Sequence, residues 1–530
     1  MTPTTKLSLV RTPEEDLPLS ATELQRELQT KADAVAAMVK DWGARAEPVS
    51  FKEFEQALRQ IVFGLARVAI AWFLARREQH VMHGYPPGER VERGERRFRR
   101  APPIARSLTT MFGVVRYART YLREVGCGAR HGFHPLDVEL GLVGDRFSWN
   151  VLAIAARLAT KLSFAEARAT LATFVPDAPS TEVIEHVVLG LGRHTADWFA
   201  QVPAPEGDGE VLVIMFDSKG APTATESELS RRRGKRRRRR MPASPRHRGR
   251  HRRLRYDKKP RRKKGDKSKN AKMATMVVMY TLKRHAKKLL GPINRRLYAS
   301  FAPKRHAFAI ARREANKRGF GPGSGKLIQI VTDGDPDLAT YVALDFPEAM
   351  HTIDVMHVVE KLWTAGECFY AEGEKPLRDW VNAQKDHLYA GKIDAILAGL
   401  RRRFDAIART GPGNKGKRER LHGVIRYLEK RVTKMPYDKL IKQDLELGSG
   451  AVEGAIKNII GKRCDHGGMR WIKERVEAVV QLRCIEANGD WDAFVDFVHD
   501  RMRDATQRDG TRRRLQAAVP APLPELQEAA

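Results

Sequence analysis

Cysteine is scarce in this sequence. The four cysteines among 530 residues are widely separated: Cys127, Cys368, Cys464 and Cys484. Such spacing excludes a disulfide framework and a four-cysteine metal site, and it suits a reducing cytoplasm. Cys127 is followed by His131 and His134, but zinc-ribbon spacing is absent, and the sequence does not decide whether these three residues bind a metal.

Long uninterrupted apolar runs are also lacking. The longest apolar stretch, around Ile61 to Leu74, is interrupted by Arg67 and is shorter than a membrane span requires. The first twenty residues contain no apolar signal core. We therefore expect neither secretion nor a membrane partner.

Acidic residues are outnumbered, and the excess of positive charge is concentrated in one segment. The chain carries 97 Lys and Arg against 64 Asp and Glu, a net charge of +33. Residues 231 to 269 hold 23 of these cations and only two acids, Asp257 and Asp266. A run of this composition cannot bury apolar area, so we expect a disordered insertion over 228–270 that grips phosphates. Its predicted DNA contacts are Arg236, Arg237 and Arg238, and RNA is an open alternative partner.

The N-terminal part of the chain predicts helices followed by a hairpin. Residues 20 to 85 have helical periodicity, and Ser50 and Glu53 stand at capping-box spacing. Alternation around Phe112 and Gly113 predicts a β-hairpin. We assign an N-terminal helical region to 1–100 and a small, degenerate zinc-ribbon-like β module to 101–135.

The segment 136–205 predicts a helix-turn-helix-like DNA-binding unit. Ser163 and Glu166 form a second capping-box pattern, and another helix follows a Pro-Asp-Ala-Pro turn. An ordinary helical hairpin would give the same pattern, so DNA reading by this segment is one of two interpretations.

The centre of the chain changes to apolar runs that predict strands of a sheet buried on both faces. They are VLVIMF after 209, 272–282, 296–302, 326–332 and a run from 350. Three strands in a meander, then strand, helix (Pro336 to Leu344) and strand, is the order of an RNase H-like α/β core. The fold class is therefore multidomain α/β plus α. We assign the first part of the core to 209–365, a helical insertion to 366–445, the last part of the core to 446–500 and a C-terminal tail to 501–530.

Two aspartates end predicted strands of this core. Asp217 closes VLVIMFD and Asp333 closes LIQIVTD. In a parallel arrangement both carboxylates emerge at neighbouring carboxyl ends of the sheet, where open α/β sheets place their sites. A turn or cap role would explain either aspartate alone.

A glutamate follows in GSGAVEGAIKNIIGKR. Glu453 lies in the first turn of a predicted helix, whereas its rival Glu446 precedes two glycines and would sit on a loop, so Glu453 is preferred. Two aspartates and this glutamate can hold a pair of Mg²⁺ ions, with Mn²⁺ as the alternative metal. Cations and an aromatic side chain follow and predict DNA contacts: Lys457, Lys462, Arg463, Arg470 and Trp471.

A further pair stands in TIDVMHVVEKLW. Asp354 and His357 are three residues apart at a predicted strand-to-helix transition. They are candidates for ordering the site or for contacting a base, and a core histidine is the alternative for His357.

FDSKG, VTDGDP, TIDVMHVVEKLW and GSGAVEGAIKNIIGKRCDHGGMRW, in this order, resemble the DDE transposases of bacterial insertion sequences, of the Kra type allied with the Mutator group. The resemblance covers roughly residues 100 to 480 and implies a metal-dependent RNase H-like enzyme with Asp217, Asp333 and Glu453 as its catalytic triad. Asp354 and His357 match the group's Asp-x-x-His signature. Ser218 stands where relatives carry glycine.

This resemblance implies an enzyme that cleaves transposon ends and transfers the 3′ hydroxyl ends into target DNA. Its partners would be the terminal inverted repeats, the target DNA and a second or further copy of the chain, on the bacterial nucleoid in the cytoplasm. Two other classes stay open: a structure-specific nuclease on the same core, and a non-catalytic DNA-binding protein derived from a transposase.

Overall fold

The computed structural model describes residues 17–93, 96–127, 132–142, 146–230, 271–465, 469–509 and 514–523. The chain divides into two compact units: unit 1 comprises 1–194 and 490–520, and unit 2 comprises 195–489 and 521–530. The basic run with Arg236, Arg237 and Arg238 lies outside the described residues.

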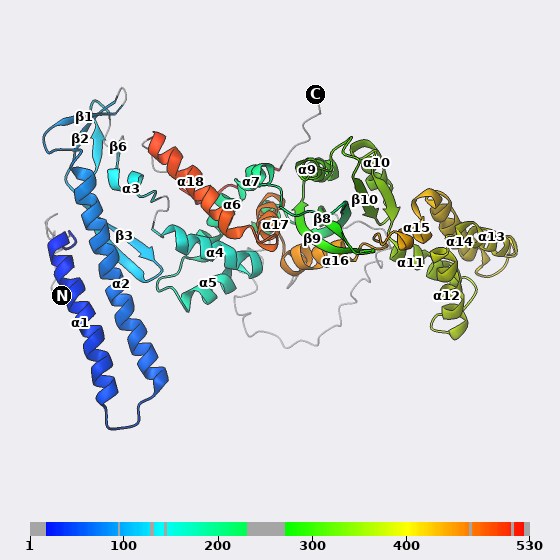
Figure 1. Ribbon diagram of the computed structural model, residues 1–530, viewed down its shortest axis with the longest axis horizontal. Helices are drawn as coiled ribbons and strands as arrows, with labels where there is room; N and C mark the ends of the chain where they lie inside the picture. The colour runs from blue at the N-terminus through cyan, green and yellow to red at the C-terminus, as the bar shows by residue number, and fades with distance from the viewer. Residues whose placement is uncertain are drawn as a thin grey trace, which may run out of the picture. The chain divides into compact units, whose positions relative to one another are not determined.

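Unit 1 begins with two long helices that pack side by side, α1 (Ala21–Ala44) and α2 (Phe51–Met82) (Figure 1). Ser50 accepts a hydrogen bond from the backbone N–H of Glu53, which confirms the predicted start of α2. Val68, Ala71 and Leu74 of α2 pack with Leu108 in a buried cluster.

The apolar stretch within α2 corrects the sequence interpretation. Among the described helices, α2 is the one that is long and apolar enough to cross a membrane by length and composition alone. The run Ile61 to Leu74 is part of a helix of 32 residues, so length alone does not exclude a span. A core helix passes the same test, and Arg67 in its middle donates a hydrogen bond to the carbonyl of Phe112 at 3.0 Å.

The rest of unit 1 combines two small sheets with helices. The sheets have strand orders β1-β2-β5-β6 and β3-β4. The elements are β1 (Arg90–Arg93), β2 (Arg96–Arg100), β3 (Ile104–Thr110), β4 (Gly113–Arg119), β5 (Leu122–Glu124), β6 (Gly132–Phe133), α3 (Pro135–Glu139), α4 (Trp149–Lys161), α5 (Phe164–Ala172), α6 (Thr181–Gly192) and α18 (Trp491–Asp509). Thr110 pairs with Gly113, whose φ of +109° suits glycine, so the predicted hairpin is confirmed.

The helices around the Pro-Asp-Ala-Pro turn form as the sequence predicts. Ser163 and Glu166 make a complete capping box at the start of α5. Helices α4, α5 and α6 pack pairwise. However, α6 contains Glu182 and Glu185 and no Lys or Arg, so a DNA-reading role for this helix stays a prediction.

Unit 2 is built around a five-stranded sheet of order β11-β10-β7-β8-β9. Strands β7, β8 and β9 are consecutive antiparallel neighbours, and β10 runs parallel to both β7 and β11. The strands are β7 (Val211–Pro222), β8 (Ala271–His285), β9 (Lys288–Ser300), β10 (Leu327–Thr332) and β11 (Met350–Ile353). The predicted meander and the parallel strands that follow it are confirmed.

Helices cover the sheet and continue beyond it. They are α7 (Thr195–Gln201), α9 (Lys304–Lys317), α10 (Pro336–Asp345), α11 (Val355–Gly366), α12 (Lys375–Tyr389), α13 (Ile393–Asp405), α14 (Asn414–Glu429), the short η1 (Val432–Lys434), α15 (Tyr437–Lys442), α16 (Gly450–Ala455), the π-helical η2 (Ile456–Asp465) and α17 (Lys473–Ala487). The helical character predicted between 366 and 445 is confirmed, including the break before α14.

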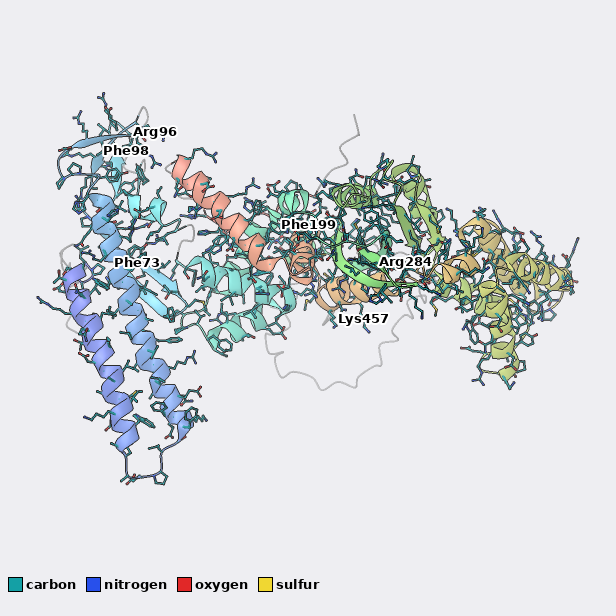
Figure 2. The ribbon with its side chains drawn as sticks, in the orientation of Figure 1. Phe73, Arg96, Phe98, Phe199, Arg284 and Lys457 are labelled. Atoms are coloured by element: carbon teal, nitrogen blue, oxygen red, sulfur yellow. The ribbon has the colours of Figure 1, made fainter. Side chains whose placement is uncertain are left out.

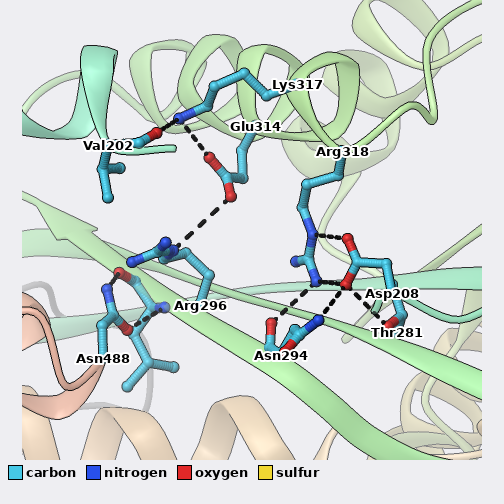
Figure 3. Close-up of polar contacts among 10 residues, drawn as sticks. Val202, Asp208, Thr281, Asn294, Arg296, Glu314, Lys317, Arg318 and Asn488 are labelled. Atoms are coloured by element: carbon cyan, nitrogen blue, oxygen red, sulfur yellow. Dashed lines mark hydrogen bonds and ion pairs between the residues drawn. The ribbon is translucent and has the colours of Figure 1, made fainter. Parts of the chain in front are cut away.

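A buried polar network fixes the edge of this sheet (Figure 3). The guanidinium of Arg318, at the end of α9, donates to both carboxylate oxygens of Asp208 at 2.6 and 2.8 Å. Asn294 and Thr281 also donate to Asp208. Burial raises the pKa of the Asp208 carboxyl, but the hydrogen bonds from Arg318 and Asn294 outweigh burial and lower it below its usual value.

Candidate active site

Three aspartates occupy equivalent positions on the three parallel strands. Thr332 of β10 is in register with Phe216 of β7 and with Ile353 of β11. The next residue in each case is an aspartate: Asp217 lies inside β7, whereas Asp333 and Asp354 directly follow β10 and β11. The prediction that Asp217 closes its strand was therefore wrong, because β7 continues to Pro222 in its pairing with β8. The carboxyl ends of parallel strands meet at one edge, so the three residues lie side by side across the sheet.

The ring of Phe216 determines which face of the sheet Asp217 points to. Phe216 stacks on Phe308 of α9, with ring centroids 3.8 Å apart. Successive side chains of a strand point to opposite faces, so Asp217 points to the face away from α9. Helix α16 contacts β7 and β8.

Asp217 is half-buried and is surrounded by charged groups. The backbone N–H of Ser218 donates to its Oδ1 at 2.5 Å. Burial raises the pKa of the Asp217 carboxyl, and the negative charges of Asp333 and Glu453 raise it further, while His357 and the Ser218 hydrogen bond oppose this. Asp217, Asp333, Glu453 and His357 are therefore close enough to interact electrostatically.

The turn that contains Asp333 is held by Tyr427 of helix α14 and by Arg431, which follows the end of that helix. The Tyr427 hydroxyl donates to the carbonyl of Asp333 at 3.1 Å, and the Arg431 guanidinium donates to the carbonyl of Gly334 at 2.5 Å. The guanidinium of Arg431 also lies 4.1 Å from the centroid of the Tyr427 ring. On the turn itself, the N–H of Asp335 donates to Asp333 Oδ1 at 2.8 Å. The orientation of Asp333 thus depends on residues that the sequence analysis did not identify.

Asp354 is fully buried and caps α11. The N–H of Met356 donates to its Oδ1 at 2.7 Å, and the Ser449 hydroxyl forms a short hydrogen bond to its Oδ2. The N–H of Val355 donates to the carbonyl of Leu447 at 2.9 Å. Asp354 therefore fastens the segment immediately before α16 to the end of β11, and its role in ordering the site stays a prediction.

Glu453 approaches this corner from α16. It lies in the first turn of the helix, as predicted, and its side chain is exposed. Potential ligand atoms of Asp354, His357 and Glu453 all lie within 4.8 Å of one another, so this group could hold a metal ion. The Nδ1 of half-buried His357 lies 3.3 Å from Glu360. Asp217 and Asp333 are not part of this tighter group.

The rival glutamate has a different environment. The backbone of Glu446 exchanges two hydrogen bonds with the amide side chain of Gln329, at 2.7 and 3.0 Å. Its carboxylate contributes to raising the pKa of Tyr280 on β8, behind the larger effect of burial. Glu446 thus has structural partners and does not belong to the metal-compatible group.

The predicted DNA contacts after Glu453 fall into two sets. Lys457, Lys462 and Arg470 are exposed. Arg463 is only 2% exposed, so the prediction of a phosphate contact for it is wrong in this structure. Its guanidinium lies 4.7 Å from the centroid of the half-buried Trp471 ring, and Trp471 also pairs with Thr223 through a backbone bridge. These two side chains support the fold around η2.

The residues near Cys127 form no metal-compatible group within the described ranges. Cys127 is exposed, and His134 Nδ1 lies 2.9 Å from the carbonyl of Thr120. Burial and the charge of Arg119 lower the pKa of His134 to about 4. His131 lies outside the described residues.

The donor set at the end of the sheet suits a divalent cation. It combines carboxylates of Asp217, Asp333 and Glu453 with a neighbouring Asp-His pair, and hard cations prefer such oxygen ligands. The pKa of the Asp217 carboxyl is raised chiefly by burial and further by the negative charges of Asp333 and Glu453, and a bound cation would offset both effects. The residues present therefore fit a divalent metal such as Mg²⁺ or Mn²⁺, without selecting between them.

No protein-family model and no curated protein matches this sequence. One solved transposase complex is similar. The similarity is to the Drosophila P element transposase strand transfer complex, at a TM-score of 0.28 and 10% sequence identity, covering 65% of this chain and 93% of that chain. At this TM-score the similarity carries no argument, so the functional conclusion rests on the residues and the geometry.

Proposed function

We propose that this chain is a DDE-type DNA transposase of a bacterial insertion sequence, built on an RNase H-like core. The observation that carries the proposal is the register of the sheet. It aligns Asp217, at the point of β7 where pairing with β10 stops, with Asp333 directly after β10, while α16 supplies Glu453 near Asp354 and His357. The order β9-β8-β7-β10-β11, three antiparallel strands followed by two parallel ones, supports the RNase H-like assignment.

The proposed reaction has two phosphoryl-transfer steps at one site. Water attacks the phosphorus at a transposon end, and the DNA 3′ oxygen leaves and takes up a proton. The freed 3′ hydroxyl then attacks a phosphodiester of the target, so one target bond breaks as one new bond forms and no external energy source is required.

Each residue of the site has a role in these steps. The carboxylates of Asp217, Asp333 and Glu453 would hold two Mg²⁺ or Mn²⁺ ions, which as Lewis acids would lower the pKa of the attacking hydroxyl and stabilise the leaving oxygen. Asp354 fixes the approach of α16 through Ser449. The exposed Lys457 and Lys462 on η2 would bind DNA phosphates.

The test is a nicking and strand-transfer assay with Mg²⁺ on DNA that carries the element's flanking repeats. We expect Asp217→Ala, Asp333→Ala and Glu453→Ala to lose both nicking and joining while they still bind DNA. Glu446→Gln is the matched control, because this glutamate lies outside the metal-compatible group, and we expect it to remain active. Nicking without joining by the wild type would instead support a nuclease, and DNA binding without cleavage would support a non-catalytic protein.

A further inference from the structure

The four-stranded sheet of unit 1 has two unlike faces. Phe98 of β2, Leu122 of β5 and Phe133 of β6 pack in a buried cluster with Val138. Phe98, labelled in Figure 2, thus marks the inner face of the sheet. Residues adjacent to Phe98 and Leu122 on their strands point to the opposite, outer face.

The outer face presents three arginines in a row. Arg99 of β2 is the register partner of Arg90 on β1 and of Arg123 on β5. Directly paired residues of antiparallel strands project from the same face, so the three side chains lie next to one another. All three are exposed. We call Arg90, Arg99 and Arg123 the arginine row.

The nearby acids are engaged elsewhere. Glu92 pairs with Arg97 at 3.1 Å, and Glu124 lies 3.9 Å from Arg96. Among the described residues, no ion pair joins a member of the arginine row to an acid. Like charges directly opposite one another destabilise a sheet, so the row is an arrangement that folding alone does not favour. An anionic partner would remove this repulsion.

We propose that the arginine row binds the phosphodiester backbone of double-stranded DNA. Neighbouring strands lie about 4.8 Å apart, so the row spans about 10 Å. A DNA strand carries one phosphate per roughly 3.4 Å of helix axis, and its phosphates also wind around that axis, so a row of this length can meet about two consecutive phosphates. Guanidinium groups suit this partner because they donate two parallel hydrogen bonds to one phosphate. The choice of DNA as the polyanion rests on the proposed function.

The row would position the DNA without reading its sequence. Contacts to phosphates fix the register and orientation of a protein on a duplex but carry no base information. The affinity that the row contributes should therefore be similar for all duplex sequences and should fall steeply with salt.

The test compares the full-length triple variant R90A/R99A/R123A with a control that loses the same charge. The control, R26A/K40A/R76A, removes three exposed cations from α1 and α2 of the same unit. Binding of a short fluorescent duplex is followed by anisotropy between 50 and 200 mM salt, the range in which phosphate contacts dominate affinity.

The proposal predicts different salt dependences of DNA affinity for the arginine-row variant and the control. We expect the slope of log K against log salt to become shallower by about 2 in the arginine-row variant, because each lost phosphate contact removes about 0.9. The control should keep a slope close to that of the wild type. A wild-type slope in the arginine-row variant would overturn the proposal. An equal change in both variants, or a loss confined to duplex RNA, would also overturn it.

Two further measurements separate misfolding and failure of the proposed function from failure of this inference. In the absence of DNA at low salt, the arginine-row variant should melt no lower than the wild type, because repulsion within the row is relieved. Asp217→Ala should keep the wild-type salt slope while joining is lost. The wild type could fail to join DNA while the arginine-row variant still shows the shallower salt slope. That result would contradict the proposed function and would support DNA binding by the arginine row.

Discussion

Lys462 is exposed, whereas Arg463, the next residue, is buried beneath Trp471. Their chemistry is similar, and the sequence offered no ground for treating them differently. The path of η2 decides which side chain reaches solvent, so Lys457 and Lys462 remain candidates for phosphate contact and Arg463 does not. The residue type thus suggests a phosphate contact for all three cations, and burial excludes it for Arg463 alone.

A second prediction at this scale concerns the hydroxyl of Tyr427, which we expect to orient Asp333. We expect Tyr427→Phe to reduce nicking by about 10- to 100-fold, the usual cost of losing a partner that orients a metal ligand. The cause is loss of its hydrogen bond to the carbonyl of Asp333. Nicking rates should be measured as a function of Mg²⁺ concentration, because a loosened Asp333 should raise the concentration required.

Tyr341→Phe is the control for this change. The Tyr341 ring packs against Phe308, and among the described residues no hydrogen bond joins Tyr341 to Asp333, so loss of its hydroxyl should leave the Mg²⁺ dependence unchanged. Equal Mg²⁺ requirements in the wild type and in Tyr427→Phe would contradict an orienting role for Tyr427.

Glu477 predicts a pH-dependent stability of unit 2. Burial raises the pKa of its carboxyl from 4.5 to about 7, although Ser300, Phe301 and Gln481 all donate hydrogen bonds to it. The folded state therefore binds the proton more tightly than the unfolded state. This contribution is fully present below pH 4.5 and is lost as the pH rises to about 7, by up to about 3 kcal/mol.

Urea unfolding between pH 4 and pH 8 measures this effect. The fall in unfolding free energy across that range should be smaller in Glu477→Gln, which cannot ionise. Glu474→Gln, on the same helix, serves as the control and should follow the wild type. Parallel pH profiles for the wild type and Glu477→Gln would show that Glu477 does not titrate in this window.

Connections between elements set the geometry of the candidate site more than the elements themselves do. The turn from β10 into α10 passes through Gly334, whose φ is +87°. A Cβ atom there would lie 2.6 Å from the Tyr427 hydroxyl and 2.9 Å from Arg431 Nε. The turn and α14 therefore fit together only because this position lacks a side chain.

Gly334→Ala should consequently disturb the site. We expect it to lower the free energy of unfolding by about 1–2 kcal/mol, the cost of a left-handed conformation for a residue with a Cβ, and to reduce nicking more than stability alone explains. Gly423→Ala is the matched control, since Gly423 is helical with no atom near its missing Cβ. It should stabilise α14 by about 1 kcal/mol. Wild-type nicking by Gly334→Ala would contradict the proposed contact.

At the scale of the whole molecule, the positive charge of residues 231–269 is expected to determine much of the affinity for DNA. The net charge of +33 would fall to +12 if residues 231–269 were replaced by a neutral linker of equal length. We expect that replacement to weaken DNA binding strongly at physiological salt and to make its salt dependence shallower. Nicking of saturating DNA at low salt should persist, because none of the candidate site residues belongs to this run. Anisotropy measures the change in DNA binding, and a nicking assay measures the change in cleavage. Loss of nicking at saturating DNA would show that residues 231–269 are needed for the cleavage step.

The path of the chain makes unit 1 discontinuous. Residues 490–520 return to it after residues 195–489, the larger segment of unit 2. In unit 1, the backbone of Leu515 lies against Gly190, where a Cβ would meet its carbonyl oxygen at 1.6 Å. No local pattern could predict this return, because the packed residues are far apart in sequence.

The sequence by itself determined the elements and the main candidates. Apolar runs predicted the strands of the sheet, caps at Ser50 and Ser163 predicted helix starts, and the settings of Asp217, Asp333 and Glu453 nominated them, because each signal depends only on near neighbours. Tertiary structure alone decided the burial of Arg463, the hold of Tyr427 on Asp333 and the alignment of Arg90, Arg99 and Arg123. These depend on strand register and on contacts between distant residues, which local physical chemistry does not encode.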